Sequence, residues 1–244
     1  MEKPYYGYPT WHILLNLLFG SILLAAAMIG FFMIHHLMLI LILPAAYLIW
    51  RGVLWMRGGF LDEKLRIREE FLRIVKPVDG ELVLDVGTGG GLLAIGYAKA
   101  MKTGKVIGID VWVPAAGGTS RENAIKNARI EGVSELVEFR EADARDIPFP
   151  DNYFNKVVAS FSIHTIHYRE RSKAFKEMIR VLKPGGIMAI LEPESDRWIK
   201  WRVDDNLKKM LEELGLKNIQ FHPITITYPR KRKAYIIVGV KKAS

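Results

Sequence analysis

The segment of residues 82–91, Leu-Val-Leu-Asp-Val-Gly-Thr-Gly-Gly-Gly, constrains the fold of this chain more than any other. An apolar run containing one acid, Asp85, passes into a turn rich in glycine, and an apolar helical pattern follows over residues 92–98. Glycine allows positive φ and a close approach of the backbone to a ligand, and the free N–H groups at a helix start attract ligand oxygens. The sequence therefore predicts a strand–turn–helix unit that binds a nucleotide-like cofactor at the turn.

The glycine spacing and the acid together indicate the class of cofactor. A dinucleotide fingerprint places glycines at relative positions one, three and six, and the sixth position counted from Gly87 is Leu92. Counting from Gly89 gives a partial match, but the Asp85 carboxylate would repel a pyrophosphate. An acid at this strand end is better suited to a cofactor that carries positive charge.

Two further acids follow predicted strands. Residues 105–110 form a second strand that ends in Asp110, whose carboxylate would accept hydrogen bonds from both ribose hydroxyls. A third strand, residues 137–140, leads to Asp143. Ligands of open α/β sheets bind outside the carboxyl ends of the strands, so we expect the three carboxylates to lie beside the glycine-rich turn.

The pattern Asp85-x-Gly87-x-Gly89-x-Gly91 resembles the first motif of class I S-adenosylmethionine-dependent methyltransferases, whose cofactor carries ammonium and sulfonium cations. With a fourth strand at residues 156–161 and the run of residues 178–186, approximately residues 61–242 look like the methyltransferase domain of the ubiquinone/menaquinone-biosynthesis type.

This resemblance implies an α/β fold with a Rossmann-like wound sheet of seven strands, S-adenosylmethionine as the cofactor, and Asp143 bound to the adenine amine. The cofactor-binding residues that it implies are Asp85, Gly87, Thr88, Gly89, Gly91, Asp110, Val111, Asp143, Ala144 and Ser160. The chain departs from the family after Asp110, where residues 111–118 form a longer, glycine-rich lead into the next helix. Trp112 in this segment is a candidate for stacking on the adenosine.

Apolar periodicity and capping signals place the remaining elements. Thr119 and Glu122 form a capping box that opens a helix to about Glu131. The other predicted elements are a helix at residues 61–75, a helix around residues 175–182, a fifth strand at 187–191, a last helix at 203–214 and a closing hairpin of strands 224–228 and 234–240.

An apolar segment precedes this domain. Between Lys3 and Arg51 the chain has no Lys, Arg, Asp or Glu, and the apolar stretch is close to twice the roughly 20 residues that one membrane span needs. We predict an α-helical transmembrane hairpin with spans at about residues 13–33 and 37–55. Residues 1–57 are then the membrane anchor and residues 58–244 the methyltransferase domain.

The hairpin has two other interpretations, a signal peptide and a buried core helix. A signal peptide has an apolar region of only about 7–15 residues, which favours membrane insertion here. Basic residues precede the first span and follow the second, so the positive-inside bias predicts an integral membrane protein with a cytoplasmic catalytic domain. The aromatic residues expected to form an interfacial belt are Tyr5, Tyr6, Tyr8, Trp11, Trp50 and Trp55.

Methyl transfer from a sulfonium needs alignment, exclusion of water and disposal of a proton, and no covalent nucleophile. His164 follows the fourth strand and is the first candidate for a general base or a substrate contact, although a structural or solvated histidine at a helix start is an equal alternative. The sequence shows no convincing metal cluster, and the absence of cysteine excludes thiolate sites.

The net charge of +9, from 35 basic and 26 acidic residues, is compatible with a nucleic-acid partner. The run of residues 230–233, Arg-Lys-Arg-Lys, favours an anionic cytoplasmic leaflet instead, with a solvated turn as the alternative. We therefore predict a membrane-anchored methyltransferase acting on an amphiphilic acceptor, either a lipid headgroup or a quinone ring. Methylation of a membrane protein or a soluble metabolite, and a non-catalytic cofactor-binding scaffold, are the alternatives.

Overall fold

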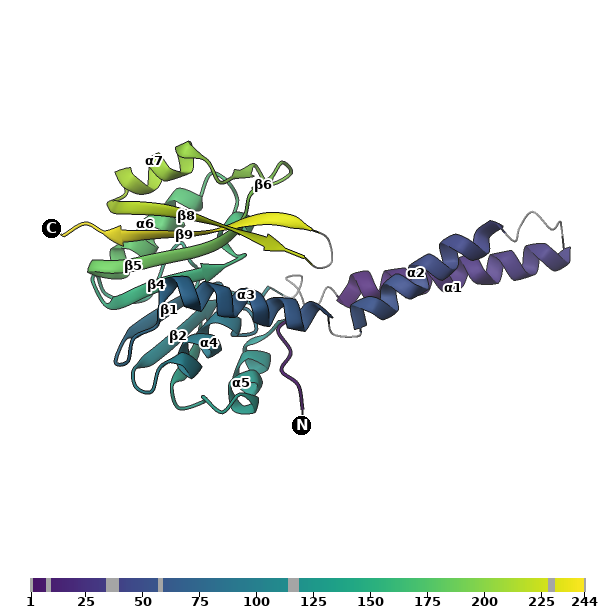
Figure 1. Ribbon diagram of the computed structural model, residues 1–244, viewed down its shortest axis with the longest axis horizontal. Coiled ribbons are helices and arrows are strands. Elements are labelled where there is room, and N and C mark those ends of the chain that lie inside the picture. Colours follow the sequence, from purple (N-terminus) through teal and green to yellow (C-terminus); the bar gives the residue numbers. More distant parts are fainter. Residues whose placement is uncertain are drawn as a thin grey trace.

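Two apolar helices project from an α/β domain in the computed structural model, which describes residues 2–7, 10–33, 40–56, 59–113, 119–227 and 231–243 (Figure 1). Helix α1 spans Thr10–Met33 and helix α2 spans Ile42–Met56. The second helix therefore begins later than the predicted residue 37. The predicted turn at His35 and His36 lies outside the described residues.

Small residues form the contact between these two helices. Gly20, Ala27 and Ala45 are buried, and a Cβ added at Gly20 would lie 2.7 Å from Cγ1 of Ile49. The large apolar side chains point outward instead, among them Leu14, Phe19, Ile22, Ile29, Leu43 and Trp50. Small residues inside and large apolar residues outside are typical of helices packed in lipid.

A seven-stranded sheet forms the centre of the domain, in the order β3-β2-β1-β4-β5-β9-β8. The strands are β1 Leu82–Val86, β2 Lys105–Asp110, β3 Val137–Glu141, β4 Phe154–Ser160, β5 Leu182–Pro193, β8 Leu216–Ile226 and β9 Arg232–Lys241. Strands β1 to β5 are parallel, and β9 runs antiparallel to both β5 and β8. This arrangement confirms the predicted Rossmann-like wound sheet.

Helices cover both faces of the sheet (Figure 1). One apolar core joins the sheet to α3 Gly59–Val75, α4 Leu92–Ala100 and α5 Arg121–Ile130. The other core joins the opposite face to α6 Arg171–Val181 and α7 Asp205–Glu213. Alternate strand residues enter the two cores, as in Val83 and Leu84, which explains the continuous apolar runs of these strands.

Three predictions about local structure are wrong. The cap of α5 is Ser120, whose Oγ accepts from the Asn123 N–H at 3.2 Å, and not Thr119, because the helix begins one residue later than expected. The closing hairpin is longer than predicted and begins at Leu216. Tyr6 is buried against the domain, so it does not belong to an interfacial belt.

The segment before the hairpin contacts the α/β domain. Residues 2–7 precede α1, and within them Tyr5 is bonded to α5 and Tyr6 is buried. The division at residue 57 stays a prediction. The chain starts on the domain, leaves it through α1, returns through α2 and enters the domain again at α3 (Figure 1).

Candidate active site

A cavity of about 1450 Å³ opens at the carboxyl ends of the parallel strands. It lies where β2 and β4 flank β1 and the strand order reverses, which is the position where open α/β sheets bind ligands. Its volume exceeds the roughly 300–1,000 Å³ of an ordinary ligand pocket and leaves room for a cofactor and a second molecule. The predicted residues that line it are Asp85, Gly87, Thr88, Gly89, Asp110, Val111, Asp143, Ala144 and Ser160.

The glycine-rich turn after β1 forms the floor of the cavity. Gly87 has a φ of 70° and Gly89 a φ of 54°, and a Cβ at Gly87 would lie 2.2 Å from Cβ of Ser162. Gly91 also has positive φ, but it caps α4 and packs against Phe139 instead of lining the cavity. Gly91 therefore shapes the turn, and the prediction that it touches the cofactor is not supported.

Asp85 lies beneath this turn and is only 1% exposed. Its Oδ2 accepts hydrogen bonds from Oγ1 of Thr88 at 2.7 Å and from the N–H of Ala94 at 3.1 Å. Burial raises the pKa of Asp85 to about 7, although these two hydrogen bonds oppose the shift. A cation bound in the cavity would favour the ionised carboxylate.

Asp110 joins the end of β2 to the same turn. Its Oδ2 accepts from the N–H of Gly89 at 2.8 Å, and its Oδ1 accepts from the N–H of Trp112 at 2.8 Å. The Trp112 indole N–H donates to the Gly89 carbonyl at 2.9 Å, and Trp112 is not among the residues that line the cavity. The expected stacking of Trp112 on an adenosine is therefore not supported.

Asp143 is held by a neighbour that the sequence did not single out. Nε and Nη2 of Arg145 donate to Asp143 at 2.9 and 2.6 Å, and Nη1 of Arg145 pairs with Glu170. These hydrogen bonds lower the pKa of Asp143. Arg145 and Glu170 both line the cavity, so they belong to the site. The sequence signal available for this pair is an arginine, Arg145, two positions after an acid, Asp143.

His164 is not among the residues that line the cavity, and its role as a general base or substrate contact stays a prediction. Its Nδ1 lies 2.5 Å from Oε2 of Glu192, which is fully buried. The other carboxylate oxygen of Glu192 accepts from the N–H of Ser162 at 3.2 Å and of Ile163 at 2.8 Å. This pair holds the segment after β4 in place, whereas His167, three residues later, does line the cavity.

Residues outside the predicted set complete the wall. They come from the N-terminal segment, α3, the small two-stranded sheet of β6 Ser195–Asp196 and β7 Trp201–Arg202, and the closing hairpin: Tyr6, Gly7, Glu63, Lys64, Ile67, Asp196, Trp198, Ile226, Lys231 and Arg232. Burial lowers the pKa of Lys64 to about 8. Within the described residues there is no group of three or more His, Asp or Glu side chains arranged to hold a metal ion.

Comparison with protein families agrees with this geometry. Residues 84–190 match a family model described as a methyltransferase domain. The chain is 36% identical over 114 residues to the ubiquinone/menaquinone biosynthesis C-methyltransferase UbiE of Pseudomonas fluorescens, covering 46% of this chain and 42% of that protein. The UbiE protein of Neisseria gonorrhoeae is 38% identical over 114 residues, with 46% and 43% coverage. The chain thus spans less than half the length of these curated relatives.

Solved structures share the fold. A putative methyltransferase of Haloferax volcanii, solved with the Trm112 activator, aligns with a TM-score of 0.61 at 18% identity, covering 76% of this chain and 93% of that one. An S-adenosylmethionine-dependent methyltransferase from Aquifex aeolicus aligns with a TM-score of 0.55 at 24% identity, covering 71% and 89%.

Proposed function

Because the chain carries a class I S-adenosylmethionine-dependent methyltransferase domain of the UbiE type, we propose that it methylates an amphiphilic acceptor at the surface of a membrane in which its hairpin is anchored. The acceptor class comprises lipid headgroups and quinone rings. Its polar part would react in the cavity while its apolar part stays in the bilayer.

One observation carries this proposal: the cofactor cavity and the apolar hairpin lie at the same side of the domain. Pro193, at the carboxyl end of β5, pairs with Ala234 beside the β8–β9 turn, so that turn marks the edge where the parallel strands end. The ends of β8 and β9 at this edge point toward the side of the domain from which the hairpin projects (Figure 1). A bilayer that contained the hairpin would therefore lie against the edge at which the cavity opens.

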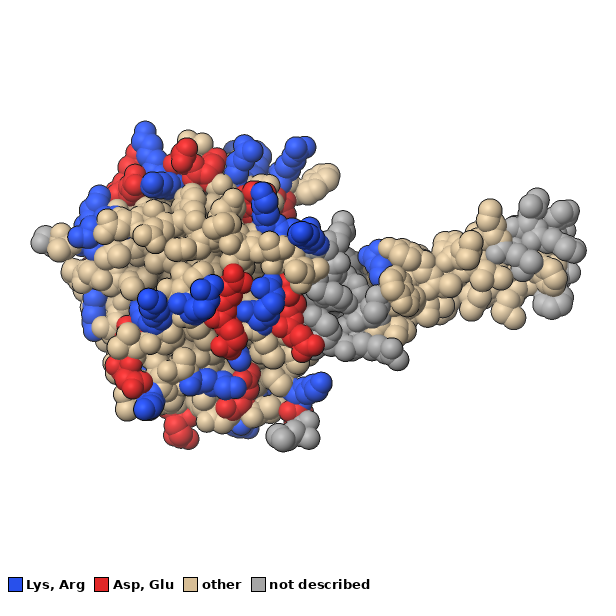
Figure 2. All heavy atoms as spheres, in the orientation of Figure 1, with Lys and Arg blue, Asp and Glu red and all other residues tan. Residues whose placement is uncertain are grey.

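The surface of the hairpin supports its insertion. The described part is uncharged except for one basic residue near its base (Figure 2). Helix α1 contains an apolar window of 18 residues, Leu14–Phe31, that is long enough to cross a membrane, and α2 has a shorter apolar stretch, Ile42–Val53. Large outward apolar side chains on both helices need a partner, and hydrocarbon is the partner that suits them.

Charge gives the orientation that we propose. Lys3 precedes α1, and Arg51 lies near the end of α2, so basic residues mark the end of the hairpin nearest the domain. Under the positive-inside rule this end, and the domain with it, is cytoplasmic.

S-adenosylmethionine supplies an electrophilic methyl group on a sulfonium, and the protein must bind, orient and desolvate the two reactants. We propose that the Asp85 carboxylate favours the positive charge of the cofactor. The Asp110 carboxylate would accept hydrogen bonds from the ribose hydroxyls. Asp143 would accept from the adenine amine after its hydrogen bonds with Arg145 are exchanged. His167 lines the cavity, and we propose it in place of His164 as the group that takes the acceptor's proton.

The test is turnover by the full-length protein with a methyl-labelled donor and membrane extract in vesicles. We expect label in the organic-solvent-extractable lipid and quinone fraction, and its loss in the Asp110→Ala variant. Label in protein or in the aqueous fraction would instead support a membrane protein or a soluble metabolite as the acceptor. Tight cofactor binding without turnover on any fraction would support a non-catalytic scaffold.

A further inference from the structure

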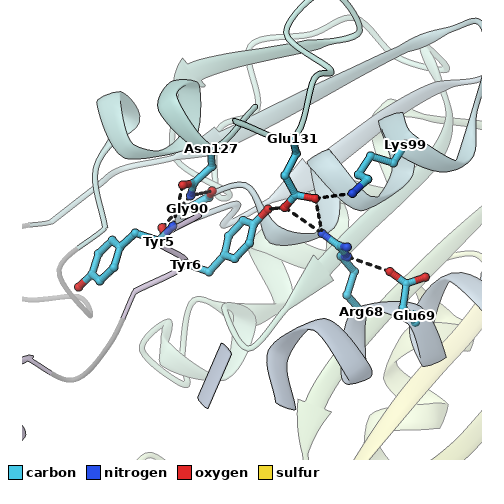
Figure 3. Close-up of polar contacts among 8 residues, drawn as sticks. All are labelled: Tyr5, Tyr6, Arg68, Glu69, Gly90, Lys99, Asn127 and Glu131. Atoms are coloured by element: carbon cyan, nitrogen blue, oxygen red, sulfur yellow. Dashed lines mark hydrogen bonds and ion pairs between the residues drawn. The ribbon is translucent and has the colours of Figure 1, made fainter. Parts of the chain in front are cut away.

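We propose that residues 2–7, which we call the clasp, are a working part of the cofactor site, and that Asn127 is the positioning residue that joins the clasp to the glycine-rich turn. The clasp crosses the turn beside α5 (Figure 3). This inference rests on the proposed function, since it takes S-adenosylmethionine as the ligand of the turn. It adds a coupling between cofactor binding and the segment that leads into the membrane hairpin.

Asn127 on α5 is 1% exposed and uses its side-chain amide on both sides. Toward the clasp, its Oδ1 accepts from the N–H of Tyr5 at 2.8 Å and its Nδ2 donates to the Tyr5 carbonyl at 2.6 Å. Toward the turn, the same Nδ2 donates to the Gly90 carbonyl at 2.9 Å. A buried amide with these bonds fixes the two backbones relative to each other, because leaving any of these groups unpaired is costly.

Gly90 shows a second, independent adaptation to the clasp. Unlike Gly89 and Gly91, it does not have positive φ, so its backbone conformation is open to other residues. A Cβ at Gly90 would nevertheless lie 3.1 Å from the carbonyl oxygen of Tyr5 and 3.1 Å from Cα of Tyr6. The missing side chain thus makes room for the clasp backbone.

Glu131 ties the clasp to the helices on either side of it (Figure 3). Its carboxylate accepts from the hydroxyl of Tyr6, from Nη1 of Arg68 on α3 at 3.2 Å, and from Nζ of Lys99 on α4 at 2.7 Å. The clasp precedes the hairpin and α3 follows it, so one carboxylate binds a residue from each of the two segments that flank the hairpin.

The clasp also reaches the cavity. Tyr6 and Gly7 line it together with Gly89 and Gly90, and Nζ of Lys64 donates to the carbonyls of Tyr6 and Gly7. A ligand that orders the turn should therefore favour the docked clasp, and the docked clasp should raise the affinity for that ligand by the same factor.

Calorimetric titration of the full-length protein in detergent with S-adenosylhomocysteine tests this coupling. We expect Asn127→Ala and Gly90→Ala to weaken binding by about tenfold or more. Tyr6→Phe, which removes only the hydroxyl bonded to Glu131, should weaken it less. The control is Asn206→Ala, an exposed asparagine near the start of α7, which should bind as the wild type does. A circular-dichroism melt of each variant reports whether the domain remains folded.

A reciprocal measurement separates coupling from general damage to the turn. The chain has no cysteine, and Nζ of Lys126 pairs with Oε1 of Glu2 at 2.5 Å, so a Glu2→Cys/Lys126→Cys pair cross-linked by a short bismaleimide reports the docked clasp. Asn127→Ala should slow this cross-linking, and saturating S-adenosylhomocysteine should accelerate it again. The coupling would be overturned if Asn127→Ala bound S-adenosylhomocysteine as tightly as the wild type and if the ligand did not change the rate of cross-linking. Failure of the wild type to bind would overturn the proposed function itself.

Discussion

We expect the protonation state of Asp85 to affect cofactor binding. Its pKa of about 7 arises from burial, and cationic groups in the cavity would lower it. Binding would then release a proton, so we expect the affinity for S-adenosylmethionine to increase from about pH 6 to about pH 8. Calorimetry over this range, in buffers of different ionisation enthalpy, measures both the affinity and the proton release. In Asp85→Asn the affinity should be lower and nearly independent of pH.

The ligand-free protein should show the opposite trend for the same residue. The folded pKa of Asp85, about 7, lies above its ordinary value of 3.8, so its contribution to stability is complete below about pH 4 and is lost as the pH rises toward 7. Asp85→Asn should therefore stabilise the ligand-free domain most at neutral pH. Greater destabilisation at neutral than at acidic pH would contradict the assignment.

Glu131 should be important for stability as well as for the clasp. Burial alone would raise its pKa, but hydrogen bonds from Lys99 and Tyr6 and the charge of Arg68 lower it, so the carboxylate is ionised at neutral pH. Glu131→Ala removes the buried carboxylate that pairs with the buried Arg68 guanidinium, and we expect a loss of about 3 kcal/mol of unfolding free energy. Urea denaturation measures it, with the exposed Glu135→Ala as a control expected to change stability by less than about 0.5 kcal/mol.

Among the elements, the hairpin depends on close approach of α1 and α2 at Gly20. Its missing Cβ would lie 2.7 Å from Ile49 and 3.1 Å from the Ala45 carbonyl, so Gly20→Leu should separate the helices without breaking either one. We expect an unchanged helix content by circular dichroism and a lower thermal midpoint in detergent micelles. Leu18→Ala, at an exposed position two residues away, is the control. An unchanged midpoint in Gly20→Leu would show that this contact is not needed.

The sequence predicted best those elements whose structure is decided locally. Strands β1 and β2 match their predictions because each is an apolar run that ends at or beside an acid. The first half of β8 was missed because its buried residues Leu216 and Ile219 are three positions apart, across an irregularity in the pairing between Lys217 and Gln220, so no strict apolar alternation marks it. Its strand conformation depends on pairing with β9.

Long-range contacts explain why parts of the site were not predicted. The apolar and aromatic character of residues 2–7 indicated a membrane interface, whereas Tyr5 is bonded to Asn127, 122 residues further along the chain. His164 follows β4 as expected, but the side chain that decides its direction is Glu192, 28 residues away. A sequence without aligned relatives gives no signal for either pair.

For the whole molecule, we expect the placement of charge to decide how the domain meets a bilayer. Lys231 and Arg232, at the start of β9, line the cavity together with Trp198, which is 96% exposed. The end of the sheet at which β9 begins faces the hairpin (Figure 1). Each basic residue near an anionic surface contributes about 1 kcal/mol of attraction, and an exposed tryptophan suits the headgroup region. We therefore expect this edge to rest on the cytoplasmic leaflet.

Charge reversal distinguishes attraction of this edge to the membrane from attraction by the net positive charge of the whole protein. Lys231→Glu/Arg232→Glu removes two attractions of about 1 kcal/mol each and adds repulsion, so turnover on anionic vesicles should fall by at least about 30-fold, and much less on acceptor dispersed in neutral detergent. Lys209→Glu/Lys217→Glu carries the same change in net charge at exposed positions outside the cavity lining and should keep vesicle turnover close to wild type. An equal loss in both double variants would mean that net charge alone attracts the membrane. An equal loss on vesicles and in detergent would place Lys231 and Arg232 on the acceptor itself.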